Sequence, residues 1–257
     1  MKLTISLIIP ALNEEAGLEP TVNKVIQALG EKFIDYEILI VNDGSQDKTG
    51  EIADRLAANN CHIRVFHNPK NLGLGYNYRR GVGLATKDYI GWVPGDNDTT
   101  LASLENIFGA VGQEDIVVVY IKSDIRGWIR QSVSKSFCTL LNLLFGLKLK
   151  YFNGPCVHKS EILQRTKMTT NGFAFMAETL IRLIKAGHGY TEVGLDGQMR
   201  QGGKSKAFLF KNWIRVLTVI FRLFMEIQIV GTLKGGYKLA GSVERSLSIE
   251  DNSSKES

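Results

Sequence analysis

The first 120 residues alternate short apolar runs with amphipathic segments, and this alternation restricts the chain to few folds. Apolar runs of strand length lie at 3–10, 36–43, 62–68, 87–96 and 115–120. Segments with helical spacing of apolar residues separate them at 18–29, 46–59, 75–85 and 101–111. Such an order is typical of a mostly parallel sheet covered by helices. The sequence therefore predicts an α/β fold.

Composition places the chain among globular proteins of a reducing compartment. Its 257 residues are 44% hydrophobic, enough for one large or two small packed domains. Cys61, Cys138 and Cys156 are too few and too far apart for a disulfide framework. The four histidines show no ligand spacing, so no zinc site is expected. The apolar run before Pro10 is too short for a signal peptide, and a cytoplasmic location is predicted.

Charge is distributed unevenly along the chain. Residues 1–119 carry 10 Lys and Arg against 16 Asp and Glu, whereas residues 120–240 carry 19 against 6. The net charge of +5 therefore conceals segments of −6 and +13. The basic segment indicates an anionic partner, which could be nucleic acid, an acidic lipid surface or a phosphorylated substrate. No recognisable nucleic-acid motif is found, so nucleic acid is not an expected partner.

Polar or small residues follow three of the expected strands directly. They are Asn13 and Glu14 after the first strand, Asp43, Gly44 and Ser45 after the second, and Asp96, Asn97 and Asp98 after the fourth. The carboxyl ends of parallel strands lie at one edge of a sheet, where ligands bind. An acidic or amide group at this edge can contact a base or ribose, and a small turn lets the backbone approach the ligand.

The stretch WVPGDNDTT places two carboxylates, Asp96 and Asp98, one residue apart, where they repel each other. One interpretation is a polar turn after a buried strand, since Pro, Gly, Asp and Asn are common turn residues. The other is a Mg²⁺ or Mn²⁺ site shared with the oxygens of a diphosphate. The other polar residues at the same edge favour the metal site.

Two other nucleotide-binding folds are disfavoured. The stretch NLGLGYNYRRG contains Gly73-x-Gly75, but Tyr78 occupies the third glycine position of the dinucleotide fingerprint. The stretch also follows the third strand and not the first. No P-loop sequence occurs.

Four stretches, SLIIPALNEE, LIVNDGSQDKT, NLGLGYNYRRGVGLA and GDND, resemble in order and spacing the motifs of family 2 glycosyltransferases with the GT-A fold. Within that family the chain is most similar to the dolichyl-phosphate mannose synthase and bacterial polyprenyl-phosphate glycosyltransferase branch. The resemblance covers roughly residues 4–205 and is strongest up to Asp98. It implies an inverting transfer from a GDP- or UDP-linked sugar, with Mg²⁺ or Mn²⁺.

The resemblance also implies roles for the matching residues. Together with the turn residues above, the donor-contacting set is Pro10, Asn13, Glu14, Asp43, Gly44, Ser45, Gly73, Gly75, Asp96 and Asn97. Asp96 and Asp98 would hold the metal and the diphosphate. Two positions depart from the branch: Thr100 stands where Gln or His is frequent, and Lys150 stands where an aspartate commonly precedes Gly154. The third metal ligand and the acceptor therefore stay open.

Residues 173–207 resemble the last conserved block of the family, a helix carrying Glu178, a strand and a basic glycine-rich loop. Arg200 and Lys204 in that loop could close on a diphosphate and stabilise it as a leaving group, or could form a solvated basic loop. Glu178 is a candidate general base for a hydroxyl acceptor, or it faces solvent or an arginine. A lipid phosphate needs no strong base.

Two apolar segments, 132–152 and 208–231, indicate contact with lipid. In the second, Lys211, Arg215, Arg222 and Glu226 fall on one stripe of an otherwise apolar helix. This pattern predicts a helix in a membrane interface, with the cations favouring anionic lipid. A buried packing helix is the alternative, and four charges make a membrane-spanning helix costly.

We therefore predict a GT-A domain over residues 1–207, with a nucleotide-sugar half at 1–119 and an acceptor half at 120–207. An amphipathic helical segment at 208–240 and a disordered tail at 241–257 would follow. The expected partners are a nucleotide sugar, a polyprenyl phosphate or lipid-linked acceptor, and the cytoplasmic membrane surface. Transfer to a hydroxyl of a lipid-linked saccharide or a polysaccharide is the alternative, and a homo-oligomer stays open.

Overall fold

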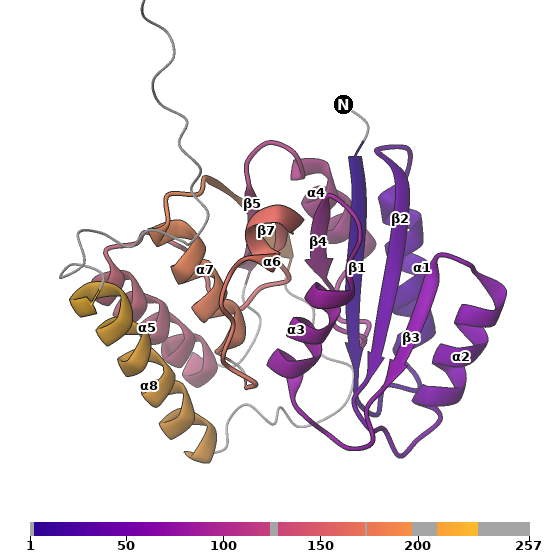
Figure 1. Cartoon of the computed structure of the whole chain (residues 1–257), viewed down its shortest axis with the longest axis horizontal. Coiled ribbons are helices and arrows are strands. Elements are labelled where there is room, and N and C mark those ends of the chain that lie inside the picture. The colour runs from indigo at the N-terminus through magenta and orange to yellow at the C-terminus, as the bar shows by residue number, and fades with distance from the viewer. Residues whose placement is uncertain (1–2, 124–127, 173, 197–209, 231–257) are drawn as a thin grey trace, which may run out of the picture.

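A computed structural model describes residues 3–123, 128–172, 174–196 and 210–230 of the chain (Figure 1). The first half alternates strands and helices as predicted. Its elements are β1 (Leu3–Ala11), α1 (Leu18–Leu29), β2 (Phe33–Asn42), α2 (Thr49–Asn59), β3 (Ile63–His67), α3 (Leu74–Leu84), β4 (Tyr89–Trp92), α4 (Leu101–Ala110) and β5 (Ile116–Ser123). The predicted α/β class is confirmed.

The second half is more helical. Its elements are α5 (Trp128–Phe145), β6 (Val157–Lys159), α6 (Ser160–Gln164), α7 (Phe175–Lys185), β7 (Tyr190–Asp196), α8 (Phe210–Phe224) and the π-helix η2 (Met225–Val230). The short elements β6 and α6 were not predicted, because three and five residues are too few to show a period. The predicted tail at 241–257 lies outside the described residues.

Seven strands form one sheet in the order β3-β2-β1-β4-β6-β5-β7. The pairs β1–β2, β1–β4, β2–β3 and β5–β7 are parallel, and β6 runs antiparallel to both of its neighbours. The chain moves outward from β1 to β3 on one side and resumes with β4 on the other. The strand order therefore reverses between β1 and β4, and in open α/β sheets ligands bind at such a point, beside the carboxyl ends of the strands.

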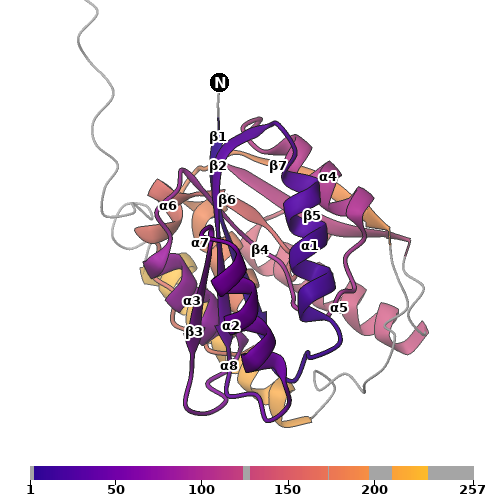
Figure 2. The same cartoon turned by 90° about the vertical axis from the view of Figure 1, so that its right-hand side faces the viewer.

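Successive side chains of each strand point to opposite faces of the sheet, and both faces are covered. In β1, Ile5, Leu7 and Ile9 pack in a core with α1 and α4, whereas Ile8 packs in a second core with α3 and α7. Figure 2 shows α1 and α4 on one side of the sheet and α3 and α6 on the other. Because both faces are buried, the strands are nearly continuous apolar runs.

Helix α8 and η2, which fall within the predicted helix at 208–231, pack against this second core on one side. Ile220, Leu223 and Ile227 are buried there, so the alternative of a packing helix holds for this face. Glu226 pairs with the buried Arg182, with 2.8 Å between Arg182 Nη2 and Glu226 Oε2. Glu226 of the charged stripe therefore contacts the protein, because a buried guanidinium requires a counter-ion.

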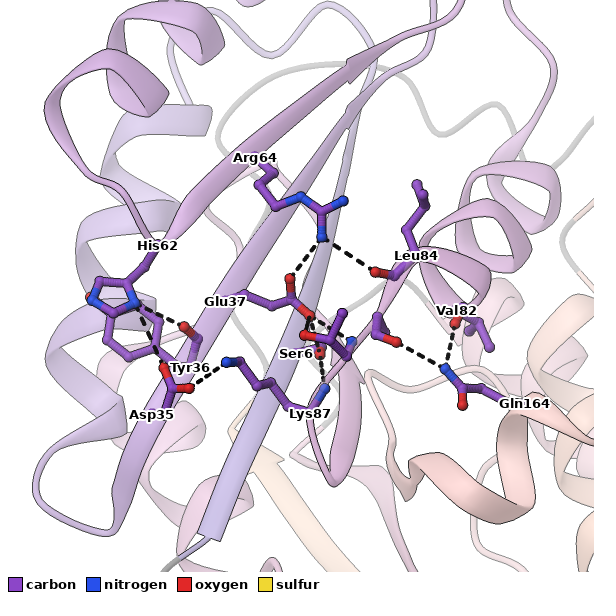
Figure 3. A network of polar contacts seen from close by, with 12 residues as sticks. Ser6, Asp35, Tyr36, Glu37, His62, Arg64, Val82, Leu84, Lys87 and Gln164 are labelled. Carbon is purple, nitrogen blue, oxygen red and sulfur yellow. Dashed lines mark hydrogen bonds and ion pairs between the residues drawn. The ribbon is translucent and has the colours of Figure 1, made fainter.

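A buried carboxylate, Glu37, joins strands β1, β2 and β3 to the turn before β4 (Figure 3). Its Oε1 accepts hydrogen bonds from Ser6 Oγ at 2.7 Å, from the Thr86 amide at 2.7 Å and from Thr86 Oγ1 at 2.9 Å. Its Oε2 accepts one from Arg64 Nη1 at 3.0 Å. Burial by itself raises the pKa of Glu37, but these hydrogen bonds outweigh it and hold the pKa below its ordinary value.

Replacing Glu37 with Gln should therefore destabilise the fold in a pH-dependent way. The amide group of Gln would face the donors of Ser6 and Thr86, which costs about 1–3 kcal/mol of unfolding free energy. Because the folded-state pKa is lowered, the carboxylate's contribution is complete above the unfolded pKa of 4.5 and is lost as the pH falls through the folded pKa. Urea unfolding should show that wild type has a higher unfolding free energy than the variant at neutral pH. This difference should become smaller at acidic pH.

The matched control is Glu105→Gln, because Glu105 is exposed on α4. It should leave the unfolding free energy unchanged within about 0.5 kcal/mol. If the Glu37→Gln variant is as stable as wild type at neutral pH, the Glu37 carboxylate does not stabilise the fold.

Candidate functional site

The parallel strands β1, β2, β3 and β4 all end at the same edge of the sheet, so the loops that follow them gather there (Figure 1). These loops span residues 12–17, 43–48, 68–73 and 93–100. Apart from Pro10 at the end of β1 and Gly75 at the start of α3, the donor-contacting residues expected from the sequence lie in them. Pro10 contributes its carbonyl, which accepts a hydrogen bond from the Gly95 amide at 3.3 Å.

Hydrogen bonds join the first two loops into one unit. Asn13 has a φ of +56°, a conformation that asparagine tolerates better than most residues. Its amide donates to Ser45 Oγ at 3.0 Å, and its Oδ1 accepts from the Gln46 amide at 2.9 Å. The Glu14 amide donates to Thr49 Oγ1 at 2.7 Å. The two loops therefore hold each other at this edge of the sheet.

Asp43 fixes the third loop. Its side chain is 3% exposed and accepts hydrogen bonds from Asn68 Nδ2 at 2.9 Å and from the Leu72 and Gly73 amides at 2.8 and 3.0 Å. A carboxylate has about four acceptor positions, and these bonds occupy three. Asp43 thus organises the loop and keeps capacity for one further donor, such as a group on a nucleoside.

Three glycines permit close crossings of the chain. Gly44 has a φ of +72°, and a Cβ there would lie 2.7 Å from the Lys70 backbone. A Cβ on Gly73, whose φ is +96°, would lie 2.7 Å from the Asn171 carbonyl oxygen, and one on Gly75 would lie 2.2 Å from the Thr170 carbonyl oxygen. Side chains at these positions would collide with backbone, so glycine is required. The backbone at Gly73 and Gly75 therefore packs directly against a segment from the second half of the chain.

The acidic turn is supported by helix α1. The Asp98 amide donates to Asp96 Oδ1 at 3.2 Å, and Asn97 takes a φ of +62°. The Asn97 amide donates to Thr21 Oγ1 at 3.0 Å, and Lys24 Nζ donates to the Asn97 carbonyl at 3.4 Å. The helix thus fixes the backbone of the turn through Thr21 and Lys24.

The turn suits a hard divalent cation. Asp96 and Asp98 supply carboxylate oxygens, and the buried Oδ1 of Asn97 has no hydrogen-bond partner within the described part of the chain. Oxygen ligands of this kind bind Mg²⁺ and Mn²⁺. In the same described part, no group of three or more His, Cys, Asp or Glu side chains could hold a metal ion. Mg²⁺ prefers six oxygen ligands, so a cation held by these two carboxylates keeps positions for water or for a ligand such as a diphosphate.

Thr100 has a structural position at the end of the turn. Its Oγ1 accepts a hydrogen bond from the Ser103 amide at 3.0 Å and caps helix α4. Similar sequences often have Gln or His at this position. Here the hydroxyl of Thr100 caps helix α4.

Glu178 lies apart from the acidic turn, in α7. It is 1% exposed and pairs with Arg182, with 3.1 Å between Glu178 Oε1 and Arg182 Nη2. The prediction that Glu178 faces an arginine is confirmed, and the alternative that Glu178 faces solvent is wrong. Burial alone raises the pKa of Glu178, but hydrogen bonds from Thr170 and Thr169 and the charge of Arg182 lower it overall. Such a carboxylate is a weak proton acceptor. Arg200 and Lys204 lie outside the described residues.

Several supporting residues were not predicted. They are Gly17, Thr21, Lys24, Thr49, Asn68 and Asn171. Asn68 directly follows β3, so the rule that polar residues after strands form the site could have found it. Thr21 and Lys24 lie on a helix and carry no local motif; only the packing of α1 beside the acidic turn reveals them. A Cβ on Gly17 would lie 2.7 Å from the Gly95 carbonyl oxygen, which shows how close that packing is.

Comparisons with known proteins find similar glycosyltransferases. Polyprenol monophosphomannose synthase of Mycolicibacterium smegmatis is 28% identical over 214 residues, which are 78% of this chain and 79% of that protein. The uncharacterized glycosyltransferase EpsJ of Bacillus subtilis is 32% identical over 115 residues, 45% of this chain and 32% of that protein. The chain spans only 32–38% of the length of the first four curated relatives.

A solved structure shares the fold. Glucosyl-3-phosphoglycerate synthase from Mycobacterium tuberculosis, crystallised with Mn²⁺, UDP-glucose and phosphoglyceric acid, superposes with a TM-score of 0.69 at 18% identity. The match covers 86% of this chain and 80% of that chain.

The model of Glycosyl transferase family 2 matches residues 6–168. This region contains β1 to β6, Asp43, Gly73, Gly75 and the acidic turn. The match covers more than half of the chain, and the structure has the predicted GT-A architecture. The chain therefore belongs to the family 2 glycosyltransferases.

Proposed function

We propose that the chain is an inverting, metal-dependent glycosyltransferase that moves a sugar from a nucleotide-sugar donor to a polyprenyl phosphate at a membrane surface. The observation that carries the proposal is the Asp96–Asp98 turn after β4, which lies at the same edge of the sheet as the loops of Asn13 and Asp43. In this arrangement Asn13, Glu14 and Asp43 hold the nucleoside, and Asp96 and Asp98 hold the diphosphate through Mg²⁺ or Mn²⁺.

The donor assignment draws support from similar proteins. Crystals of the similar glucosyl-3-phosphoglycerate synthase contain Mn²⁺ and UDP-glucose. A bound divalent cation supplies neutralisation of the diphosphate as it departs. An acceptor oxygen attacks the anomeric carbon from the face opposite the diphosphate, and the bond to the diphosphate breaks as the new bond forms. One displacement inverts the configuration. Arg200 and Lys204 would stabilise the charge on the departing diphosphate.

The acceptor assignment draws support from the state of Glu178. A phosphate acceptor is already ionised at neutral pH, so no general base is needed. Transfer to a saccharide hydroxyl would need one, and Glu178 is held in an ion pair with Arg182. Relatives named polyprenol monophosphomannose synthase and dolichyl-phosphate beta-glucosyltransferase favour the same acceptor class.

The membrane surface is suggested by exposed apolar side chains on two helices that touch. Of the seven large apolar side chains exposed in the described part of the chain, six lie on α5, α8 and η2; they are Trp128, Leu140, Leu143, Leu217, Phe221 and Met225. The Phe145 and Phe224 rings join α5 to α8 with centroids 6.3 Å apart, and Figure 1 shows the two helices side by side.

A membrane interface is the occupant that fits this surface. Large exposed apolar side chains mark an interaction site, and α5 carries no acidic residue to oppose anionic lipid. None of the helices in the described ranges is long and apolar enough to cross a bilayer. We place the protein at the cytoplasmic face, with α5 and α8 lying in the interface.

Replacing Asp98 with Ala should abolish metal-dependent transfer and leave the fold intact. The turn is half-buried and outside the core, whereas charge neutralisation by a metal contributes several kcal/mol to the transition state. At about 1.4 kcal/mol per factor of ten, the rate should fall about 100-fold or more. Release of nucleoside diphosphate with Mn²⁺, together with circular dichroism, measures both effects.

The matched control for Asp98→Ala is Asp88→Ala. Asp88 is exposed just before β4, at the opposite end of the strand from the acidic turn. It should keep the wild-type rate. Near-normal turnover of Asp98→Ala, or wild-type turnover without metal, would overturn the metal assignment.

Replacing Phe221 and Leu143 with Ser should release the protein from anionic vesicles. These side chains are 66% and 78% exposed, and inserting each into lipid contributes about 1.5–3 kcal/mol. A cation near anionic lipid contributes about 1 kcal/mol, so added salt should release only part of the protein. Phe224 is unsuitable for this test, because it packs against Phe145. Vesicle co-sedimentation measures the bound fraction.

Ile34→Ser provides the control, because Ile34 is 57% exposed but lies outside α5 and α8. This variant should bind vesicles as wild type does. If wild type stays in the supernatant, or if salt alone strips it completely, the membrane assignment is wrong and the hydroxyl acceptor becomes the better hypothesis.

A further inference from the structure

A fully buried arginine joins helix α7 to the π-helix η2. Arg182 is 0% exposed, and its guanidinium contacts two carboxylates. The distances are 3.2 Å from Nε and 3.1 Å from Nη2 to Glu178 Oε1, and 3.0 Å from Nη1 and 2.8 Å from Nη2 to the two oxygens of Glu226. Removing either partner would leave a buried charge less compensated, so the bridge fixes η2 relative to α7.

Glu178 also accepts hydrogen bonds from residues of the segment between α6 and α7. We call residues 169–171 of this segment the strap. Glu178 Oε1 accepts a hydrogen bond from Thr169 Oγ1 at 2.7 Å. Its Oε2 accepts from the amides of Thr169 at 3.2 Å and Thr170 at 2.9 Å. With these contacts and Arg182, both carboxylate oxygens are engaged. Glu178 therefore orients the strap backbone.

The strap in turn lies against the loop that Asp43 organises. The Gly75 amide donates to the Asn171 carbonyl at 2.9 Å. The absence of side chains on Gly73 and Gly75 allows this approach, and the Gly73 amide donates to Asp43 Oδ2. A shift of the strap would therefore disturb the backbone that holds Asp43.

A second contact links helix α8 to the strap. Arg222 Nη2 donates to Thr169 Oγ1, the same hydroxyl that donates to Glu178. The exposed apolar helix and its π-helical extension thus hold the strap through Arg222 and through Glu226 with Arg182. These contacts form one continuous chain from α8 to the loop beside Asp43.

We infer that Glu178 is a positioning residue for the donor site and not a general base. Arg182 couples the position of η2 to that of the strap, because it binds both Glu226 and Glu178. The identity of the donor site rests on the proposed function. Donor affinity should then depend on Glu226, although none of the contacts of Glu226 given above reaches the acidic turn. The contacts made by the strap are with the loop of Asp43, so the effect should fall on binding and not on the chemical step.

Three Glu→Gln variants test this inference in the full-length protein. Glu178→Gln removes the charge that orients the strap. Glu226→Gln removes the charge that links η2 to Arg182 and, more weakly, to Lys167. Exposed Glu105→Gln is the control. Glu226 is the safer variant for folding, because its side chain is 30% exposed. The first measurement is hydrogen exchange of the Gly75 amide by NMR, without nucleotide. Loss of one hydrogen bond should lower its protection about tenfold in both variants, and not in the control.

The second measurement is binding of UDP and of GDP with Mn²⁺, followed by steady-state kinetics. Glu178→Gln and Glu226→Gln should raise the dissociation constant and the donor KM about tenfold, while kcat at saturating donor stays within about twofold. A general base would show the reverse, a collapse of kcat with unchanged KM and loss of the acidic limb of the pH profile.

Unchanged Gly75 protection in both variants, or a kcat collapse in Glu178→Gln at unchanged affinity, would overturn the inference. If wild type binds neither nucleoside diphosphate, the proposed function is wrong. The exchange of the Gly75 amide still decides whether Glu178 and Glu226 hold the strap.

Discussion

The reversal of strand order at β1 is the constraint on which the rest of the structure depends. Because β2 and β4 both pair with β1 in parallel, the loops after these strands meet at one edge. Asn13, Asp43 and the acidic turn are brought to one edge by this arrangement and not by a continuous motif. The contact of Gly17 with the Gly95 backbone brings α1 against the acidic turn, so the turn is held by a helix and not left as a free loop.

The amino-terminal half could be predicted from sequence because its local signals agree with its fold. Strands buried on both faces are apolar throughout, and the polar residues that end them are the residues proposed to form the site. The motif identified the glycines at 73 and 75, but it did not reveal why side chains are excluded there. The strap that packs against them comes from about 95 residues later in the chain. Long-range contacts of this kind leave no periodic trace in the sequence.

The carboxyl-terminal half was harder to predict, because Glu178, Arg182 and Glu226 pair with one another in the protein. Glu178 has the residue type of a general base, yet Arg182 and the strap amides occupy it. A sequence cannot distinguish a catalytic carboxylate from a buried counter-ion, since both are single acidic residues in apolar surroundings. Helix α8 is likewise both a packing helix and an exposed apolar helix, with Ile220 buried and Phe221 exposed.

The most direct test of the proposed activity is a donor screen with purified protein, Mn²⁺ or Mg²⁺ and a short polyprenyl phosphate, with release of nucleoside diphosphate as the signal. The loops around Asp43 and the acidic turn predict metal-dependent turnover of a UDP- or GDP-linked sugar, with inverted configuration in a lipid-phosphate product. Turnover that needs a saccharide hydroxyl and ignores the lipid phosphate would contradict the acceptor assignment. Absence of turnover with every nucleotide sugar and both kinds of acceptor would contradict the account as a whole.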